Sequence, residues 1–262
     1  MTIGDRCKEF EELTESKLIR KLPTFARLDG RSFHSFTKGM KRPFDEDFYK
    51  CMVETAKSLV EEFHPLIAYT QSDEITLYWH YEDDITETTK MNFNGRIQKI
   101  ISVLAGFASS KFTQLVGSVR TNNKFADRVS KIPCFDCRVW QVPTKGDALE
   151  VFLWREDDAT KNSITMAAQS VYSHRELHKK NSSDKQEMLF QKGINWNNYP
   201  NHFKRGTFLK RQNYTKQLTV EEYEKIPLKK RPKDRFITRS HVVESDLGPI
   251  RQNLHFLEKV YE

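Results

Sequence analysis

The chain alternates between apolar runs and amphipathic stretches, and this pattern predicts a sheet with helices packed against it. Residues 24–28 form a short apolar run that predicts a strand, and Asp29 and Gly30 directly after it form a turn signal. Residues 47–63 repeat apolar positions with helical spacing, and residues 67–79 hold two apolar runs around a polar tip, which predicts a hairpin. If these strands are neighbours, the end of the first strand lies beside the hairpin tip.

The rest of the chain carries the same two kinds of pattern, without an internal repeat or a low-complexity tract. Further helices are predicted at residues 5–20, 90–116, 163–173 and 183–190, and further strands at residues 131–141 and 149–155. This order of elements predicts an α+β protein whose sheet has helices on one face.

Positive charge is concentrated in one segment of the chain. The formal net charge of the 262 residues is +7, and residues 201–235 alone contain eleven Lys or Arg against four Asp or Glu. A local basic segment suits a polyanionic partner such as a nucleic acid. A solvated surface loop has the same composition, so charge alone leaves both interpretations open.

Other features argue against a secreted, membrane-spanning or metal-thiolate protein. No stretch approaches the roughly 20 apolar residues of a membrane span, and the N-terminus lacks an apolar signal core, so we expect a cytoplasmic protein. Cys134 and Cys137 have C-x-x-C spacing without a second such pair, which favours reduced, structural thiols. His174 and His178 share a predicted helix face, but without a third ligand they are typical of a polar helix surface.

A pair of carboxylates carries the candidate chemistry. Asp29 follows the first strand and Asp73 lies at the hairpin tip, 44 residues later. Converging carboxylates suit Mg²⁺, and sites with two such ions stabilise the attacking and leaving oxygens of phosphoryl transfer. An Asp at a strand end is also a common turn former, which leaves a structural interpretation open. A triphosphate would also need cations, and the candidates are Arg27, Arg31, Arg96 and Lys99.

An ordered set of segments resembles the signature segments of the tRNA(His) guanylyltransferase family of 3′–5′ polymerases. The segments are Leu28–His34, Thr70–Glu74, Arg96–Ser102, Phe135–Arg138, Trp154–Ser163, Gly193–Asn197 and Lys204–Thr207. Each segment is weak alone, and their order over about residues 1 to 210 makes the resemblance specific. It implies a polymerase-like palm with a ferredoxin-like antiparallel sheet. Residues 1–145 would form the catalytic palm, and residues 146–262 would complete it and add a helical, basic C-terminal region that binds tRNA.

The resemblance also implies roles for individual residues. Asp29, the carbonyl of Gly30 and Asp73 would bind two Mg²⁺ ions, with Glu74 as a further catalytic acid beside them. A residue without a side chain lets a backbone oxygen approach an ion closely, which fits Gly30. The residues implied in nucleotide binding are Arg27, Asp29, Gly30, Arg31, Ser32, Phe33, His34, Ser72, Asp73, Arg96 and Lys99.

Some of these residues have other interpretations on the pattern alone. Phe33 is equally compatible with a core aromatic, and Arg96 and Lys99 with solvated cations on a helix.

The residues expected to bind RNA are Lys161, Asn162, Lys204, Arg205, Lys229, Lys230 and Arg231.

The implied reaction begins with activation of a 5′-monophosphorylated RNA end by a nucleoside triphosphate. The 3′-OH of an incoming nucleotide then attacks that end, and a triphosphorylated end can skip the first step. The implied substrates are tRNA, ATP, GTP and other nucleoside triphosphates, and the implied assembly is a homotetramer.

One departure from the family pattern points to a branch of it. Members dedicated to histidine tRNA have His-Ile-Asn-Asn where this chain has Thr160-Lys161-Asn162-Ser163, so only Asn162 keeps its identity. This is similar to the branch of guanylyltransferase-like proteins, which repair 5′-truncated tRNAs with the opposite strand as template. The alternatives are a tRNA(His)-specific enzyme that adds one G, a palm-type nucleotide cyclase or forward polymerase, and a non-catalytic RNA-binding module.

Overall fold

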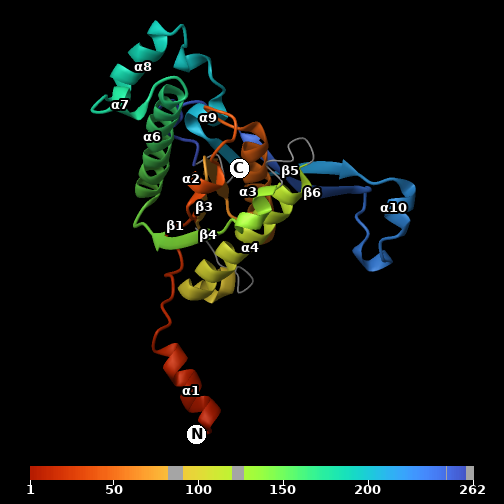
Figure 1. The fold of residues 1–262 in the computed structure, drawn as a ribbon. Coiled ribbons are helices and arrows are strands. Elements are labelled where there is room, and N and C mark those ends of the chain that lie inside the picture. The colour runs from red at the N-terminus through yellow and green to blue at the C-terminus, as the bar shows by residue number, and fades with distance from the viewer. Residues whose placement is uncertain (82–90, 120–126, 246, 258–262) are drawn as a thin grey trace.

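The computed structural model describes residues 1–81, 91–119, 127–245 and 247–257, with helices around one sheet and with segments projecting from that body (Figure 1). The helices are α1 (Ile3–Glu12), α2 (Phe33–Phe36), α3 (Glu46–Phe63), α4 (Ile97–Ser118), α6 (Lys145–Gln169), α7 (His174–Leu177), α8 (Ser182–Gln191), α9 (Asn201–Arg205) and α10 (Val220–Glu224). The strands are β1 (Thr24–Gly30), β2 (Ile67–Gln71), β3 (Glu74–Trp79), β4 (Phe135–Gln141), β5 (Thr207–Gln217) and β6 (Phe236–Ser245).

The sheet has the order β4-β1-β3-β2-β5-β6, and all neighbouring strands are antiparallel. Its first four strands follow the chain order β1-α3-β2-β3-α4-β4, which is the ferredoxin-like arrangement of a palm. The expected fold class is therefore confirmed, and β2 and β3 form the expected hairpin beside β1.

Helices α3 and α4 cover one face of the sheet. The side chains of Ala26 and Leu28 on β1 join the buried residues of both helices in one apolar cluster. Asp45 starts α3, because its carboxylate accepts hydrogen bonds from the backbone N–H groups of Asp47 and Phe48, both at 3.1 Å. These two helices form the predicted layer, but the expectation that helices cover one face only is wrong, because α6 covers the other face.

Helix α6 adds a layer on the other face, where Phe25 of β1 packs with Phe152 of the helix at 5.4 Å between ring centroids. The prediction of a strand at residues 149–155 is wrong, because α6 runs through them. Thr144 caps this helix reciprocally with Asp147, a local start signal that outweighs the apolar run that follows it.

Several predicted boundaries move. The predicted strand at 131–141 is shortened to β4, and the predicted helix at 183–190 matches α8. The helix predicted at 163–173 is the end of α6, which stops at Gln169. The helix predicted at 90–116 begins only at Ile97, and residue 90 lies outside the described residues.

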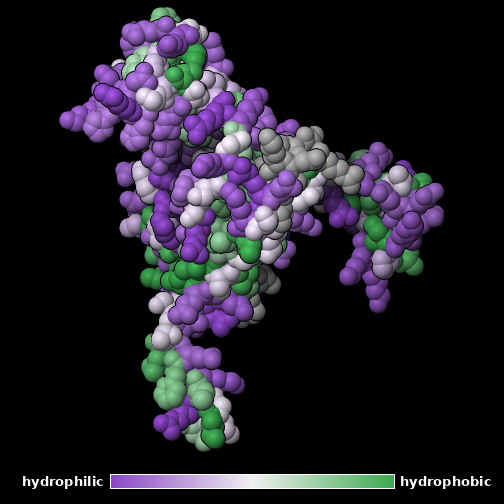
Figure 2. Space-filling view, in the orientation of Figure 1, coloured by the Kyte–Doolittle hydropathy of each residue, from purple (hydrophilic) through white to green (hydrophobic). Residues whose placement is uncertain are grey.

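The N-terminal helix projects from the body, and none of its residues is buried (Figure 1). Figure 2 shows apolar side chains on it, and Ile3 and Phe10 are among the exposed ones. The helix predicted at 5–20 ends at Glu12, because the following residues are held in extended form along the start of α4. The carbonyl of Ser16 accepts from Ile97 N–H at 2.9 Å, and Leu18 N–H donates to the carbonyl of Gly95 at 2.9 Å.

Strands β5 and β6 were not predicted. They pair over ten residues, and their far ends carry α10 as an arm that leaves the body (Figure 1). Because the outer part of this arm is exposed on both faces, its strands lack the apolar alternation by which a sequence reveals a half-buried strand.

Helix α4 corrects the expectation that no stretch approaches a membrane span. Its 22 residues are long and apolar enough to cross a membrane by length and composition. Its side chains Leu104, Ala108 and Phe112 lie in the core against α3 and the sheet, so its apolar composition serves that packing.

Candidate active site

The end of β1 and the tip of the β2–β3 hairpin meet, as the sequence predicted. Asp29 is the register partner of Glu74 on β3 and of Asp136 on β4. The N–H of Gly30 donates to the carbonyl of Asp73 at 3.0 Å, which ties the two segments together. Two residues 44 positions apart thus belong to one site.

Asp29 and Asp73 form a strained pair of like charges. Burial and, to a lesser extent, the neighbouring charge of Asp29 together raise the pKa of Asp73 to about 6. Among the residues that the structure describes, neither carboxylate forms an ion pair. Such a pair is stabilised by a cation placed between its members.

The backbone of Gly30 adds a third oxygen to this pair. Gly30 and its register partner Phe135 form a non-hydrogen-bonded pair, because the bond between the strands is made by Arg31 N–H to the carbonyl of Cys134 at 2.9 Å. Phe135 donates its N–H to Ser109 Oγ at 2.9 Å instead of to the Gly30 carbonyl. A Cβ at Gly30 would lie 2.5 Å from the ring of Phe33, so only glycine fits here. The described residues contain no cluster of three His, Cys, Asp or Glu that could hold a metal, so any metal here would depend on the predicted donors, two carboxylates and this carbonyl. Hard oxygen donors of this kind fit Mg²⁺.

Glu74 does not turn toward the pair. Both of its carboxylate oxygens accept hydrogen bonds from Arg155 Nη1 of α6, at 2.7 and 3.0 Å. The sequence singled out the segment that contains Arg155, but it gave no signal for this contact, because the partners are 81 residues apart.

The loop after Gly30 divides into exposed and buried residues. Arg31, Ser32 and His34 are exposed near the carboxylate pair. Phe33 is only 2% exposed and packs against Phe36, Phe112 and Phe135, so the prediction that it contacts a nucleotide is wrong and the core alternative is correct.

A basic pocket of about 360 Å³ lies beside Ser72 of the hairpin tip. His34, Lys38, Lys41 and Arg42 line it from the loop after β1. Met166 and Gln169 at the end of α6 close it from the other side. Lys38, Lys41 and Arg42 are close together in the sequence, but only the fold brings them to the hairpin tip.

Arg96 and Lys99 lie at the opposite end of the sheet from Asp29 and Asp73, so within one chain they are not beside these carboxylates, and their contact with a nucleotide stays a prediction. Arg96 forms a backbone β-bridge with Lys17. Ile19, two residues after Lys17, donates its N–H to Gln141 Oε1 at 2.8 Å, and Gln141 is the register partner of Thr24. Thr24 starts β1, whereas Asp29 lies five residues further along, about 17 Å at the usual rise of a strand. Both cations are exposed, which agrees with the alternative of solvated helix cations.

The predicted RNA-binding residues lie on three elements. Lys161 and Asn162 are exposed on α6, and Lys229 and Lys230 are exposed at the tip of the arm. Arg231 is used internally, because it donates to the carbonyls of Ile226 and Glu224, both at 2.8 Å. Arg231 therefore holds the tip of the arm together, and an RNA contact by it stays a prediction.

The remaining two predicted RNA-binding residues are on α9. Lys204 Nζ donates to the carbonyl of Asn197 at 2.7 Å, and Arg205 lies 3.8 Å from the buried carboxylate of Glu156. Both cations therefore hold α9 to its surroundings as well as adding to its charge.

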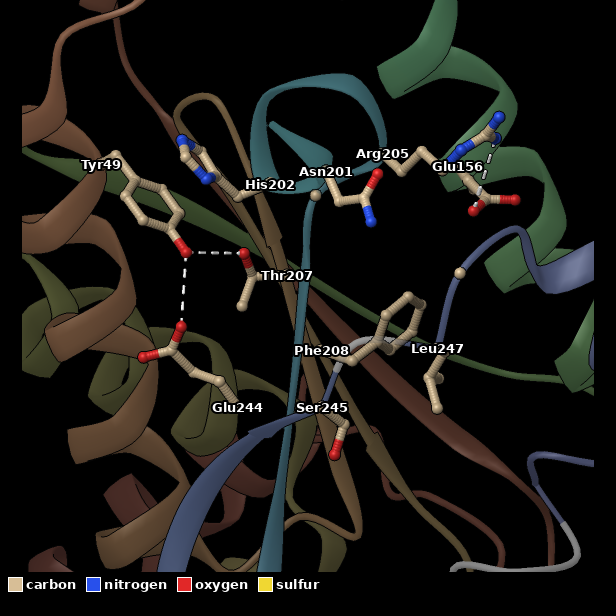
Figure 3. A pocket seen from close by; sticks show the side chains of 12 residues that line it. Tyr49, Glu156, Asn201, His202, Arg205, Thr207, Phe208, Glu244, Ser245 and Leu247 are labelled. Carbon is tan, nitrogen blue, oxygen red and sulfur yellow. Dashed lines mark hydrogen bonds and ion pairs between the residues drawn. The ribbon is translucent and has the colours of Figure 1, made fainter. Parts of the chain in front are cut away.

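Arg205 also lines a pocket of about 290 Å³ at the root of the arm (Figure 3). In Figure 3 the hydroxyl of Tyr49 points to Thr207 and Glu244, at 3.0 and 3.4 Å. His202 stacks on the Tyr49 ring at 3.9 Å. None of the carboxylates predicted to bind metal lines this pocket, so it is separate from the Asp29–Asp73 pair.

Comparisons with known proteins identify the family. The profile described as Thg1, tRNAHis guanylyltransferase, matches residues 4–143, and the one described as Thg1 C terminal domain matches residues 152–247. The tRNA(His) guanylyltransferase of Debaryomyces hansenii is 31% identical over 228 residues, 80% of this chain and 81% of that protein.

Solved structures agree with these matches. A bacterial tRNA(His) guanylyltransferase (Thg1)-like protein in complex with ATP has a TM-score of 0.80 and 31% identity, covering 99% of both chains. Its complex with GTP has a TM-score of 0.76 and 30% identity, again over 99% of both chains. The tRNA(His) guanylyltransferase of Saccharomyces cerevisiae has a TM-score of 0.65 and 25% identity, over 80% of this chain and 93% of that one. This chain belongs to the tRNA(His) guanylyltransferase (Thg1) family and is a nucleotidyltransferase.

Proposed function

We propose that this enzyme adds nucleotides in the 3′–5′ direction to the 5′ end of truncated tRNAs and chooses each by pairing with the opposite strand. The observation that carries the proposal is the unpaired Asp29–Asp73 couple next to a basic pocket. Acidic and basic groups placed together in this way suit a triphosphate that arrives with its metal ions.

Asp29, Asp73 and the Gly30 carbonyl are the residues that would hold Mg²⁺, and two ions are proposed. When bound, the ions supply charge stabilisation for the attacking and leaving oxygens of the transfer. The chain's own contribution is to hold the two carboxylates together through the hydrogen bond between Gly30 and Asp73.

The basic pocket would bind the phosphates of a nucleotide. Lys41 and Arg42 bring two charges that form no ion pair within the described residues, and Ser72 joins the pocket to the carboxylates. Arg31, Ser32 and His34 are exposed close by and complete the proposed nucleotide-binding surface. Arg27 leaves the same face of β1 as Asp29, and its guanidinium lies over the ring of Trp154 at 5.6 Å.

The repair branch rests on residues 160–163. Lys161 and Asn162 are exposed, whereas Ser163 is buried and donates to the carbonyl of Thr160 at 2.9 Å. A lysine favours phosphate, which carries no sequence information, and no planar imidazole is present to stack on an unpaired base. The similarity to the bacterial guanylyltransferase-like protein, over 99% of both chains, supports the same branch.

The tRNA itself would be held by charge along α6, α9 and the arm, and the proposed assembly is a cytoplasmic homotetramer. A tetramer would give one tRNA more surface than a single chain offers. Light scattering on the purified protein, with and without tRNA, measures this assembly directly.

The decisive experiment supplies several tRNAs that lack their first nucleotide, together with Mg²⁺ and all four nucleoside triphosphates. The base opposite the gap is varied in turn, and the 5′ end of each product is read. We expect the complementary nucleotide in every case. Addition of G alone, only to histidine tRNA and regardless of the opposing base, would instead favour a tRNA(His)-specific guanylyltransferase.

A further inference from the structure

We propose that Arg155 is a positioning residue that keeps Glu74 out of the Asp29–Asp73 site. The inference rests on the proposed metal-dependent function. It assigns Glu74 a role other than that of a metal ligand, and it gives α6 a part in the chemistry of the palm.

Four carboxylates lie at this end of the sheet, namely Asp29, Asp73, Glu74 and Asp136, and the last of them pairs with Arg138 at 3.7 Å. Glu74 is the register partner of Asp29, so the two side chains leave the same face of the sheet, about 5 Å apart at their Cβ atoms. Glu74 also follows Asp73 directly in the chain. Without a counter-charge, a third carboxylate at this position would turn toward any cation held by the other two.

Arg155 supplies that counter-charge from a fixed position. Its side chain is 5% exposed, and Nη1 contacts both oxygens of Glu74 at 2.7 and 3.0 Å. Nη2 contacts Asp158, one turn along the helix, at 3.3 Å. A guanidinium is a rigid planar group, so these contacts fix the direction in which Glu74 points.

Trp154 holds the guanidinium in place. Its ring lies 3.6 Å from the Arg155 guanidinium carbon, and the Arg27 guanidinium lies over the same ring at 5.6 Å. Arg27 comes from β1, two residues before Asp29. The stack therefore joins α6 to the strand that carries the proposed metal ligand.

The neighbouring residues of α6 bind other segments. Glu156 accepts the N–H of Ile250 at 3.0 Å, and Asp157 pairs with Arg251 at 2.6 Å. Phe152 of α6 also packs on the hairpin, through the ring of Tyr78 at 5.8 Å, but that contact is apolar and lies in the core. Arg155 brings its charge to Glu74, so a change at Arg155 affects the site while a change at Arg251 affects only the outer surface. Arg251, which pairs with Asp157 on the same helix as Arg155, is thus a matched control.

The test compares Arg155→Met, Glu74→Gln, the double variant and the control Arg251→Met in the full chain. Mn²⁺ binding is titrated by electron paramagnetic resonance without nucleotide. The rate of nucleotide addition to a 5′-triphosphorylated, truncated tRNA is then measured at saturating Mg²⁺.

In Arg155→Met the released Glu74 becomes an additional ligand, because metal affinity rises with the number of charged ligands. We expect Mn²⁺ to bind several-fold more tightly while kcat falls about tenfold and the nucleotide KM stays within about twofold. In the double variant both changes should revert toward the wild type, since a neutral amide does not compete for the ion. A purely structural role for Arg155 predicts no such recovery.

Weaker or unchanged Mn²⁺ binding in Arg155→Met, or no recovery in the double variant, would overturn the inference. If Arg155→Met does not fold, Glu74→Gln decides alone: unchanged Mn²⁺ affinity supports the inference, and a tenfold loss identifies Glu74 as a ligand and overturns it. A wild-type protein that neither binds Mn²⁺ nor extends tRNA would overturn the proposed function, and this inference with it.

Discussion

Two groups of acidic residues in this enzyme differ in what the fold does with them. On α6, Glu156 accepts a backbone N–H and lies beside Arg205, and Asp157 pairs with Arg251. At the end of β1 and the hairpin tip, Asp29 and Asp73 face each other without an ion pair in the described residues. The fold pairs the acids of α6 and leaves Asp29 and Asp73 to repel each other, so the second group is the one suited to binding a cation.

The basic residues divide in the same way. Arg155 and Arg231 are held by internal hydrogen bonds, whereas Lys229 and Lys230, on the same arm as Arg231, are exposed at its tip. Charge in a sequence therefore does not mark function by itself. The residues that the fold leaves unpaired are the ones available to substrate.

Replacing an unpaired acid should have the largest effect on activity. Asp73→Ala should lower nucleotide addition by more than about a hundredfold, since even residues that only support a metal ligand are worth about 10–100-fold. The fold should remain, because the change removes a repulsion and opens no core cavity. Rates at saturating Mg²⁺, with a thermal melt, measure both.

Asp157→Ala is the control from the paired group. It removes one surface ion pair, worth at most about 1 kcal/mol, and should leave the rate unchanged. Equal losses in the two variants would break the comparison between paired and unpaired acids.

Among the cations, Arg42→Ala should raise the nucleotide KM about tenfold, because a charge-assisted phosphate contact is worth about 1.5–3 kcal/mol. Lys99→Ala, at the far end of the sheet, should have no effect. Steady-state kinetics with ATP and GTP compare the two. A larger effect from Lys99 would mean that this residue serves a nucleotide in another copy of the chain.

The burial of Asp73 beside Asp29 predicts a smaller effect on stability. Because the folded-state pKa is about 6 and the ordinary value is 3.8, the native state holds this proton more tightly than the unfolded chain does. Stability should therefore fall as pH rises from 4 to above 6, by about 1 kcal/mol after solvent screening. Urea denaturation across this range, with Asp73→Asn as the control that lacks the change, tests the sign. Mg²⁺ should offset the loss above pH 6.

The arm should show the smallest effect. Replacing both Lys229 and Lys230 with Ala should lower the slope of log affinity for tRNA against log salt by about 2, because each phosphate contact releases condensed counterions. Arg231→Ala should instead loosen the tip of the arm, which hydrogen exchange detects. An unchanged slope in the lysine variant would place the RNA path elsewhere.

The sequence by itself determined the features that depend on nearby residues. Helical spacing and the Asp45 cap define α3, and the two apolar runs define the hairpin, so the meeting of Asp29 with Asp73 follows from a strand–helix–hairpin order. Local signals were also present for α6 in the Thr144–Asp147 capping box, although the apolar run after it was taken for a strand.

Only the tertiary structure decided which charges stay available. Strands β5 and β6 have no apolar alternation in their outer half, because there they contact mainly each other and solvent. The Arg155–Glu74 contact spans 81 residues, and the place of Arg96 at the far end of the sheet follows from the direction in which α4 packs. These outcomes depend on packing between segments that are distant in the chain. A local pattern of residue types does not predict such packing.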